Sequence, residues 1–463
     1  MNALRLQTNL SNADHNTGGL VEAAAKFCIF QVNYGLFNCD VAFPFFVWAE
    51  IDNHELLMGY SSDIGNVEFE LGAKTLERWL IKPEKTMEIV LGIPRERAQD
   101  ERRVANSPPG VQILVEHGIK VIIEKSAGHF CNFTDLDYGE AGATIADSPE
   151  ELYEQSNVIV KVSPPQPDEI SLFMPGQMLI SALHLGTITP DLIKTLIEKN
   201  ITALGFEFIE TRDGELPIVR TLSEIAGSLA IQTAAKYLET GYGGSGILLG
   251  GIAGVPPAWV TIIGAGTVGL FAAQDALGLG AQVTVIDKEI NRLRRFEAFF
   301  NRHLVTAIAN DHYIAEIAKM SDVLIGALSP RQKIIKPLVS EQVVKSMKPG
   351  SVIIDVSIDQ GACFATSRHT SHTNPIYVKH GVTHYCVPNI PSAVAKTASF
   401  ALTNTLLPFL LKLTGHETIS DILWKSHSLR KGTYLFKGYV TKKILAELTD
   451  VPFREIDMLL AAS

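Results

Sequence analysis

Short apolar, β-branched runs alternate with amphipathic stretches along most of the chain beyond residue 87. The runs predict strands at 88–94, 120–126, 157–162, 177–183 and 201–209. Between them, apolar residues at helical spacing predict helices at 109–117, 134–141 and 189–199. Strands that alternate with helices are typical of a parallel sheet with both faces covered. The pattern therefore predicts a first α/β domain.

The same alternation returns after a helical stretch at 223–240. A glycine-rich passage at 241–257 follows, which we interpret as a connector, with phosphate binding as the alternative. Beyond the strand that begins at Trp259, further strands are predicted at 303–308, 322–327, 351–358 and 383–387. A long helix is expected at 391–412, and a largely helical segment after it is expected to return to the first domain.

These elements predict an α/β protein with two doubly wound, Rossmann-like domains and an active-site cleft between them. The substrate domain is expected to be discontinuous, comprising residues 87–217 and 396–463, and the nucleotide domain to comprise 218–395. Residues 1–86 form an N-terminal extension without a repeat or motif, whose role the sequence does not give. A chain of 463 residues suits this division, because single cores stop growing near about 250–300 residues.

The stretch from Trp259 to Asp287 carries the clearest motif. An apolar strand leads into Gly264, Gly266 and Gly269 in the order GxGxxG, a helix follows, and Asp287 closes the next strand. In dinucleotide-binding turns the first glycine permits the turn, the second admits the pyrophosphate, and the third lets the helix pack on the strand. The motif predicts a dinucleotide site.

The residues around this motif favour NAD over NADP. Thr267 and Val268 open the helix, whose first N–H groups are expected to face the phosphates. Asp287 lies at the spacing at which an acid reaches the ribose hydroxyls of NAD, and its charge would repel a ribose phosphate. Lys288 and Arg292 leave NADP open as the alternative.

Composition excludes several classes of protein. The chain is 46% hydrophobic and 19% charged, as in ordinary globular proteins, and its net charge of −10 argues against nucleic acid as a partner. The five cysteines are widely spaced and show the pattern of neither a disulfide framework nor a metal site, which fits a protein of the reducing cytoplasm. They are Cys28, Cys39, Cys131, Cys363 and Cys386. The apolar run at 41–49 is too short to cross a bilayer, so no membrane segment is predicted.

Residues 88–463 resemble the alanine dehydrogenase and pyridine nucleotide transhydrogenase family, and most closely an alanine dehydrogenase. The matching passages are 92–111 (GIPRERAQDERRVANSPPGV), 158–165 (VIVKVSPP), 179–185 (LISALHL), 222–227 (LSEIAG), the GAGTVG turn, 348–364 (KPGSVIIDVSIDQGACF) and 384–392 (HYCVPNIPS). The resemblance implies reversible, NAD-dependent oxidative deamination of L-alanine to pyruvate and ammonia, in a cytoplasmic homo-oligomer, commonly a homohexamer.

The resemblance also implies roles for single residues. Arg103 falls where the family binds the substrate carboxylate, and His184 and Asp359 fall on catalytic positions. Ser223 and Asn389 fall where the family contacts the cofactor. These residue types suit the chemistry, because oxidation of an amino acid needs a cation for the carboxylate and groups that move protons.

One position departs from the family. Its alanine dehydrogenases have KVK where this chain has Lys161, Val162 and Ser163, and the second lysine is a substrate ligand. Ser163 cannot carry charge, and Lys161, two residues back on the same strand face, would lie roughly 6–7 Å short. Both remain candidate substrate-binding residues. Another 2-amino acid as substrate, or a catalytically silent NAD-binding protein, stays open as an alternative.

Overall fold

The computed structural model describes residues 46–52, 55–62, 65–71, 86–185, 188–328 and 336–462. The chain divides into two compact units, residues 1–85 and 86–463. In the first unit the described residues form an antiparallel meander of β1 (Phe46–Asp52), β2 (Glu55–Ser62) and β3 (Gly65–Leu71). This meander lies in the extension for which the sequence predicted no structure.

The first large sheet of the second unit has eight strands in the order β18-β17-β9-β8-β7-β4-β5-β6. Six of them are parallel: β4 (Val90–Ile93), β5 (Lys120–Glu124), β6 (Thr144–Ala146), β7 (Val158–Val160), β8 (Met178–Ser181) and β9 (Thr202–Gly205). The helices between them are α2 (Pro108–Glu116), α3 (Asp135–Glu140), α4 (Pro149–Gln155), α5 (Pro167–Ile170) and α6 (Pro190–Glu198). Four of these helices have proline in the first turn, where its missing N–H costs nothing.

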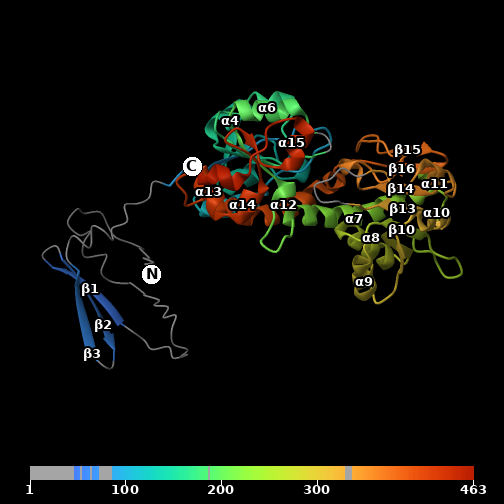
Figure 1. Cartoon of the computed structure of the whole chain (residues 1–463), viewed down its shortest axis with the longest axis horizontal. Coiled ribbons are helices and arrows are strands. Elements are labelled where there is room, and N and C mark those ends of the chain that lie inside the picture. Colours follow the sequence, from blue (N-terminus) through green and yellow to red (C-terminus); the bar gives the residue numbers. More distant parts are fainter. Residues whose placement is uncertain are drawn as a thin grey trace. The chain divides into compact units, whose positions relative to one another are not determined.

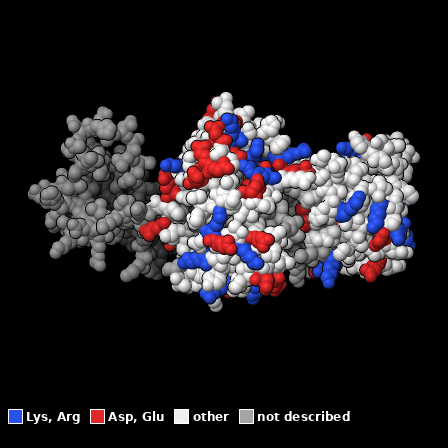
Figure 2. Space-filling view, turned by 90° about the horizontal axis from the view of Figure 1, so that it is seen from above, with Lys and Arg blue, Asp and Glu red and all other residues white. Residues whose placement is uncertain are grey.

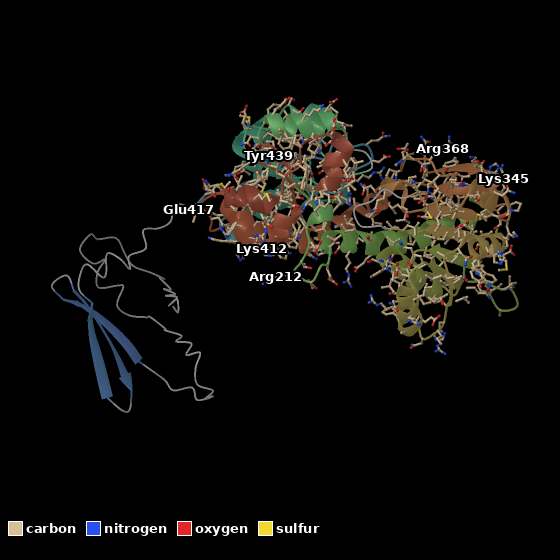
Figure 3. The ribbon with its side chains drawn as sticks, in the orientation of Figure 1. Arg212, Lys345, Arg368, Lys412, Glu417 and Tyr439 are labelled. Atoms are coloured by element: carbon tan, nitrogen blue, oxygen red, sulfur yellow. The ribbon has the colours of Figure 1, made fainter. Side chains whose placement is uncertain are left out.

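The C-terminal segment completes this sheet. Its strands are β17 (Thr433–Phe436), antiparallel to β9, and β18 (Tyr439–Val440); its helices are α13 (Ile419–Lys425), α14 (His427–Gly432), α15 (Lys443–Thr449) and α16 (Ile456–Ala461). Lys412 and Tyr439, although near the end of the chain, lie among the elements of the first sheet (Figure 3). The first sheet is therefore formed by two stretches of the chain that are far apart in sequence.

The second large sheet has seven strands in the order β12-β11-β10-β13-β14-β16-β15. They are β10 (Trp259–Ile263), β11 (Gln282–Asp287), β12 (Val305–Ile308), β13 (Val323–Gly326), β14 (Val352–Asp355), β15 (Ile376–Lys379) and β16 (Val382–Tyr385). All are parallel except β15, which pairs antiparallel with β16. The helices around it are α8 (Thr267–Gly278), α9 (Ile290–Phe299), α10 (Asp311–Met320) and α11 (Glu341–Lys345). Both sheets are doubly wound, which confirms the predicted fold class.

Two long helices join the sheets. α7 (Pro217–Leu238) runs between them and packs on α8 and α12 (Ala395–Leu410) (Figure 1). Gly227 makes the approach to α8 possible, because a Cβ on it would lie 2.5 Å from the carbonyl oxygen of Val268. The joining helices thus hold the carboxyl ends of the strands near one another.

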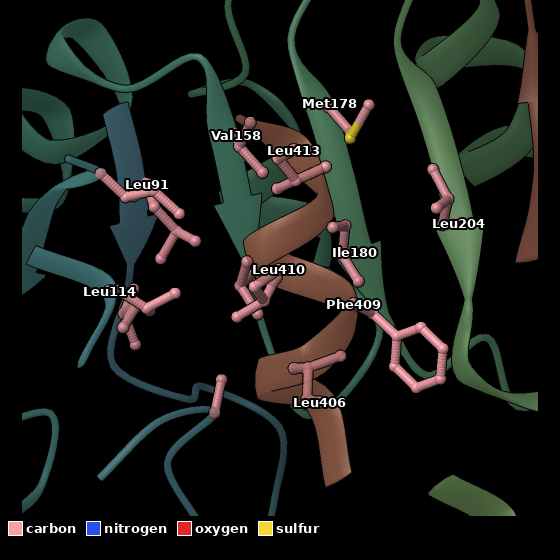
Figure 4. Close-up of a cluster of buried hydrophobic side chains, with 14 of the residues drawn as sticks. Leu91, Leu114, Val158, Met178, Ile180, Leu204, Leu406, Phe409, Leu410 and Leu413 are labelled. Carbon is pink, nitrogen blue, oxygen red and sulfur yellow. The ribbon is translucent and has the colours of Figure 1, made fainter. Parts of the chain in front are cut away.

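Helix α12 is part of the first core. Leu406 and Leu410 are fully buried and face strand residues such as Ile180 (Figure 4). With its flanking turns, the segment Ile390–Leu413 is the one stretch among the described residues that is long and apolar enough to cross a membrane. Its packing against the sheet accounts for that apolar character.

Several predicted boundaries were wrong. The strands predicted at 201–209 and 351–358 end earlier, because the chain turns into the short 3-10 helices η3 (Phe206–Phe208) and η5 (Ile358–Gln360). Helix α7 begins at Pro217, several residues before the predicted start. The sequence also missed β6, β15, β17 and β18, which are short and lie at or next to a sheet edge. Strands of two to four residues are too short to show a clear alternation of apolar and polar positions.

Candidate active site

A cavity of about 250 Å³ lies where the carboxyl ends of the two sheets, α7 and the turn before α12 meet. Ligands of open α/β sheets bind at the carboxyl ends of the strands. Among the predicted site residues, those that line the cavity are Arg103, His184, Ser223, Val268, Asp359 and Asn389. An apolar wall, which includes Ala182, Phe206, Val219 and Leu222, surrounds these polar groups.

Arg103 reaches the cavity already engaged by a carboxylate. Its Nε donates to Oε1 of Glu101 at 2.8 Å, and its Nη2 donates to Oε2 at 2.7 Å. Both residues are buried, with exposed fractions of 3% and 4%. Burial is the largest single influence on the pKa of Glu101 and would raise it. The charge of Arg103 and its hydrogen bonds nevertheless lower this pKa to about 2. One edge of the predicted guanidinium fork therefore serves Glu101, and only the Nη1 side remains for a substrate carboxylate.

Glu101 also gathers two other predicted residues. Ser163 Oγ donates to Glu101 Oε2 at 2.9 Å, and the side-chain amide of Asn389 donates to the same oxygen. Ser163 is 2% exposed and is not part of the cavity wall. Asn389 follows a strand of the second sheet, so this contact joins the two domains beside the cavity. Ser163 therefore binds Glu101 and does not line the cavity.

Lys161 does not reach the cavity, and the structure gives no support for it as a substrate ligand. It is fully buried, and its Nζ lies 2.6 Å from Oε1 of Glu169 and 3.3 Å from Oε2 of Glu96. Burial raises the pKa of Glu96 to about 7, although the charge of Lys161 opposes that rise. The Lys161 ammonium is neutralised within the first domain, so this lysine supplies no second cation to the cavity.

His184 and Asp359 lie on opposite sheets and share the cavity. His184 follows β8 and has a left-handed backbone, with φ of 52°. Asp359 lies in η5 and accepts the backbone N–H of Asn389 on Oδ2 at 3.2 Å. Burial raises the pKa of Asp359, while the charges of His184 and Arg103 act against that rise. A carboxyl group and a histidine that share a cavity can take part in general acid–base catalysis.

The glycine turn was predicted to bind pyrophosphate. Its three glycines differ in what a side chain at each position would contact. Gly264 has φ of 120°, and a Cβ there would lie 2.4 Å from the carbonyl oxygen of Ala327. A Cβ on Gly269 would lie 2.0 Å from the carbonyl oxygen of Gly264. At Gly266 the φ is −98°, and a Cβ would meet nothing within 4 Å. Gly266 leaves open space at the start of α8, which fits a cradle for a phosphate group.

This difference gives a test of the cofactor site. Gly266→Ala should fold as the parent does but weaken NADH binding by roughly 10-fold or more, about 1.4 kcal/mol, because the methyl group fills the space for the pyrophosphate. Gly269→Ala, the matched control, should lower the melting temperature, since its methyl group meets a backbone carbonyl. Titration by NADH fluorescence, with thermal unfolding, checks both; unchanged NADH affinity in Gly266→Ala would contradict the assignment.

Asp287 ends β11 and braces the glycine turn. Its Oδ2 accepts the N–H of Ala265 at 2.7 Å, its Oδ1 accepts the N–H of Glu289 at 2.8 Å, and it is 5% exposed. Arg292, whose side chain is half exposed, lies 3.8 Å from the same carboxylate. Thr267 and Val268 open α8, whose N-terminus has no side-chain cap among the described residues. These groups remain our candidates for contact with the dinucleotide.

Two substitutions separate the charge of Asp287 from its structural role. Asp287→Ala should weaken NAD binding by roughly 10-fold, the value of a charge-assisted hydrogen bond of about 1.5 kcal/mol. Asp287→Asn keeps an acceptor for the turn and removes the charge, so it should mainly reduce the preference for NAD over NADP. Dissociation constants for both nucleotides check this, and unchanged values in both variants would refute a ribose contact.

Sequence reasoning missed two glutamates at the site. Glu101 lies inside the matched ERRVA passage, two residues before Arg103, and its spacing could have suggested a pair. Glu207 follows β9 and lines the cavity, but its partners are backbone N–H groups in the segment that follows β8. Only the alignment of neighbouring strands brings Glu207 to them.

The fold and the cavity define a two-domain, dinucleotide-dependent dehydrogenase. Within the described residues, no group of three or more His, Cys, Asp or Glu side chains is arranged to hold a metal ion. On the face seen in Figure 2, basic and acidic side chains of residues 86–462 are mixed.

Comparisons with known proteins identify the family. The description "Alanine dehydrogenase/PNT, N-terminal domain" matches residues 92–226, and "Alanine dehydrogenase/PNT, C-terminal domain" matches residues 230–443. An alanine dehydrogenase of Methanococcus maripaludis is 43% identical over 367 residues, which cover 79% of this chain and 98% of the relative. One of Lysinibacillus sphaericus is 42% identical over 373 residues, covering 80% and 99%.

A solved L-alanine dehydrogenase is 38% identical with a TM-score of 0.74, and covers 78% of this chain and 99% of its own. A transhydrogenase from Sinorhizobium meliloti, 23% identical with a TM-score of 0.64, covers 76% and 99% and shares the fold. The chain belongs to the alanine dehydrogenase and pyridine nucleotide transhydrogenase family.

Proposed function

We propose that this protein catalyses the NAD-dependent oxidative deamination of L-alanine, with water, to pyruvate, ammonium and NADH, and the reverse reaction. The observation that carries the proposal is the single cavity that Arg103, His184 and Asp359 share with Val268 at the start of α8. Relatives at about 40% identity that are alanine dehydrogenases support it.

Each of the three polar residues suits one task in this reaction. The Nη1 side of Arg103 binds the substrate carboxylate by charge-assisted hydrogen bonds. His184 and Asp359 handle protons on the amine and on the water that attacks Cα after the hydride has left. Because these residues lie on two different sheets, the substrate would bind between the two domains.

The cofactor would be held by the turn and the helix beside the cavity. Gly264, Gly266, Gly269 and Thr267 would cradle the pyrophosphate, and Asp287 would bind the adenosine ribose. Ser223 and Asn389, which line the cavity, would contact the nicotinamide end. When bound there, NAD supplies the hydride acceptor for Cα.

A panel of L-amino acids tests the proposal directly. Purified protein mixed with NAD and each amino acid is followed by NADH absorbance, and pyruvate, NADH and ammonium are followed in the reverse direction. We expect reduction of NAD with alanine. NAD binding without reduction by any amino acid would favour a catalytically silent NAD-binding protein.

A second candidate is a dehydrogenase of another 2-amino acid in the same family. The observation that favours it is the charge balance around Arg103. Glu101 neutralises the guanidinium, Ser163 supplies no cation, and Lys161 is paired elsewhere. A cavity with this balance holds the substrate carboxylate less firmly, so contacts with the rest of the substrate become more important.

The remaining assignments complete the proposal. We propose residues 218–395 as the NAD-binding domain, residues 87–217 with 396–463 as the substrate domain, and residues 1–86 as an extension of unknown role. We also propose a cytoplasmic homo-oligomer, a hexamer by family resemblance, that acts in L-alanine catabolism on small molecules, with neither nucleic acid nor membrane as a partner.

A further inference from the structure

Glu207 lies beside the proposed catalytic histidine and has no role in the mechanism above. It belongs to η3, directly after β9, and it lines the cavity together with His184. Phe206 and Phe208, its neighbours on either side, are each 2% exposed and anchor the turn in the protein core. The carboxylate is therefore held in place from both sides along the chain.

The carboxylate of Glu207 binds the backbone that carries His184. The N–H of Leu183 donates to both carboxylate oxygens, at 2.9 and 3.0 Å, and the N–H of His184 donates to Oε1 at 2.8 Å. The register explains this meeting, because Ser181 at the end of β8 lies opposite Gly205 at the end of β9. The segments that follow β8 and β9 therefore begin side by side.

The backbone at His184 needs such support. Its φ of 52° lies in the left-handed region of backbone conformation. A residue with a Cβ rarely adopts this conformation unless its surroundings hold it there. Two N–H groups bound to one carboxylate fix the peptide planes on both sides of Leu183. The second of these planes contains the N and Cα atoms of His184, so it fixes the position of the Cα from which the imidazole side chain extends.

Gly205 leaves room for this arrangement. A Cβ on Gly205 would lie 3.3 Å from Oε2 of Glu207 and 3.1 Å from the ring of Phe208. Contacts this short would move the carboxylate by a few tenths of an ångström. Gly205→Ala is thus a second, milder way to disturb Glu207 without removing it.

We propose that Glu207 is a positioning residue, which fixes the peptide plane leading into His184 and so places the imidazole for its contact with the substrate. The proposal rests on the proposed role of His184 in proton transfer. Glu207 touches no reacting atom in this account and acts only through the histidine.

The test compares Glu207→Ala, Glu207→Gln and Gly205→Ala with the parent enzyme in alanine oxidation. Glu207→Ala should lower kcat by up to about 10²-fold, the cost of a displacement near 1 Å, with KM for NAD little changed. Glu207→Gln keeps one oxygen that can accept both N–H groups, so it should recover most of the activity. Gly205→Ala should give a smaller loss than Glu207→Ala.

Two comparisons separate positioning from stability. In a His184→Ala background, Glu207→Ala should cost no further activity, because residues that act as a unit are not additive. Glu151→Ala is the matched control: Glu151 also accepts a backbone N–H, from Asp147 at 3.0 Å, but lies near the far edge of the sheet. It should keep the parent kcat.

Hydrogen exchange gives a readout that does not depend on turnover. Amides 183 and 184 should exchange faster in Glu207→Ala than in the parent. A parent kcat in Glu207→Ala, or an equal further loss in the His184→Ala background, would overturn the positioning role. If Glu207→Ala does not fold, Gly205→Ala in both backgrounds decides by the same criteria. A parent enzyme without turnover on any amino acid would instead overturn the proposed function.

Discussion

Asp359→Asn should lower kcat for alanine oxidation by ~10²–10⁴-fold, the usual contribution of a general acid–base group, while NADH binding stays nearly unchanged. His184→Ala should give a loss in the same range. Both residues line the cavity, and neither braces the glycine turn. Steady-state kinetics and NADH titration measure the two effects separately.

The pH profile adds a second criterion. Burial raises the pKa of Asp359, so the fall of kcat/KM on acidification should begin above the pH at which an exposed aspartate with a pKa of ~3.9 titrates. That limb should move in Asp359→Asn. Asp322→Asn serves as control, since Asp322 is a buried aspartate of the same sheet that binds the N–H of Trp259 and does not line the cavity. Activity near that of the parent in both Asp359→Asn and His184→Ala would refute the catalytic assignment.

Ser163→Lys should lower KM for alanine, by part of the roughly 10- to 150-fold that a missing hydrogen bond to a charged group would cost, if alanine is the substrate. A hydrogen bond to a charged group contributes ~1.5–3 kcal/mol, and ~1.4 kcal/mol corresponds to a tenfold change. An ammonium at this position would lie beside Glu101, which now binds both Ser163 and Arg103. It would turn a neutral carboxylate–guanidinium pair into a cluster with net positive charge, to which a substrate carboxylate is attracted.

Ser163→Met has nearly the length of lysine without the charge, and therefore controls for the added volume in a site that is only 2% exposed. KM values for alanine and for two larger amino acids, in the parent and both variants, distinguish the candidates. If the parent prefers a larger amino acid and Ser163→Lys leaves alanine kinetics unimproved, the substrate is another 2-amino acid.

The sequence by itself determined the alternation of strands and helices in the second unit and the strand–turn–helix form of the glycine motif. Both depend on short-range patterns: β-branched runs bounded by turns give parallel strands, and three glycines at fixed spacing give a turn that passes close to a phosphate. The edge strands β6, β15 and β18, and β17 beside β18, were missed, because strands of two to four residues are too short to show a clear alternation.

Only the tertiary structure decided how charges at the site are paired. Lys161 and Arg103 are both cations near a predicted carboxylate site, yet the first is bound by Glu96 and Glu169 and the second by Glu101. A buried charge must have a partner, but the chain does not show which of its acidic residues will be that partner. The partner depends on strand order and loop path, which bring Glu96 to a lysine 65 positions along the chain.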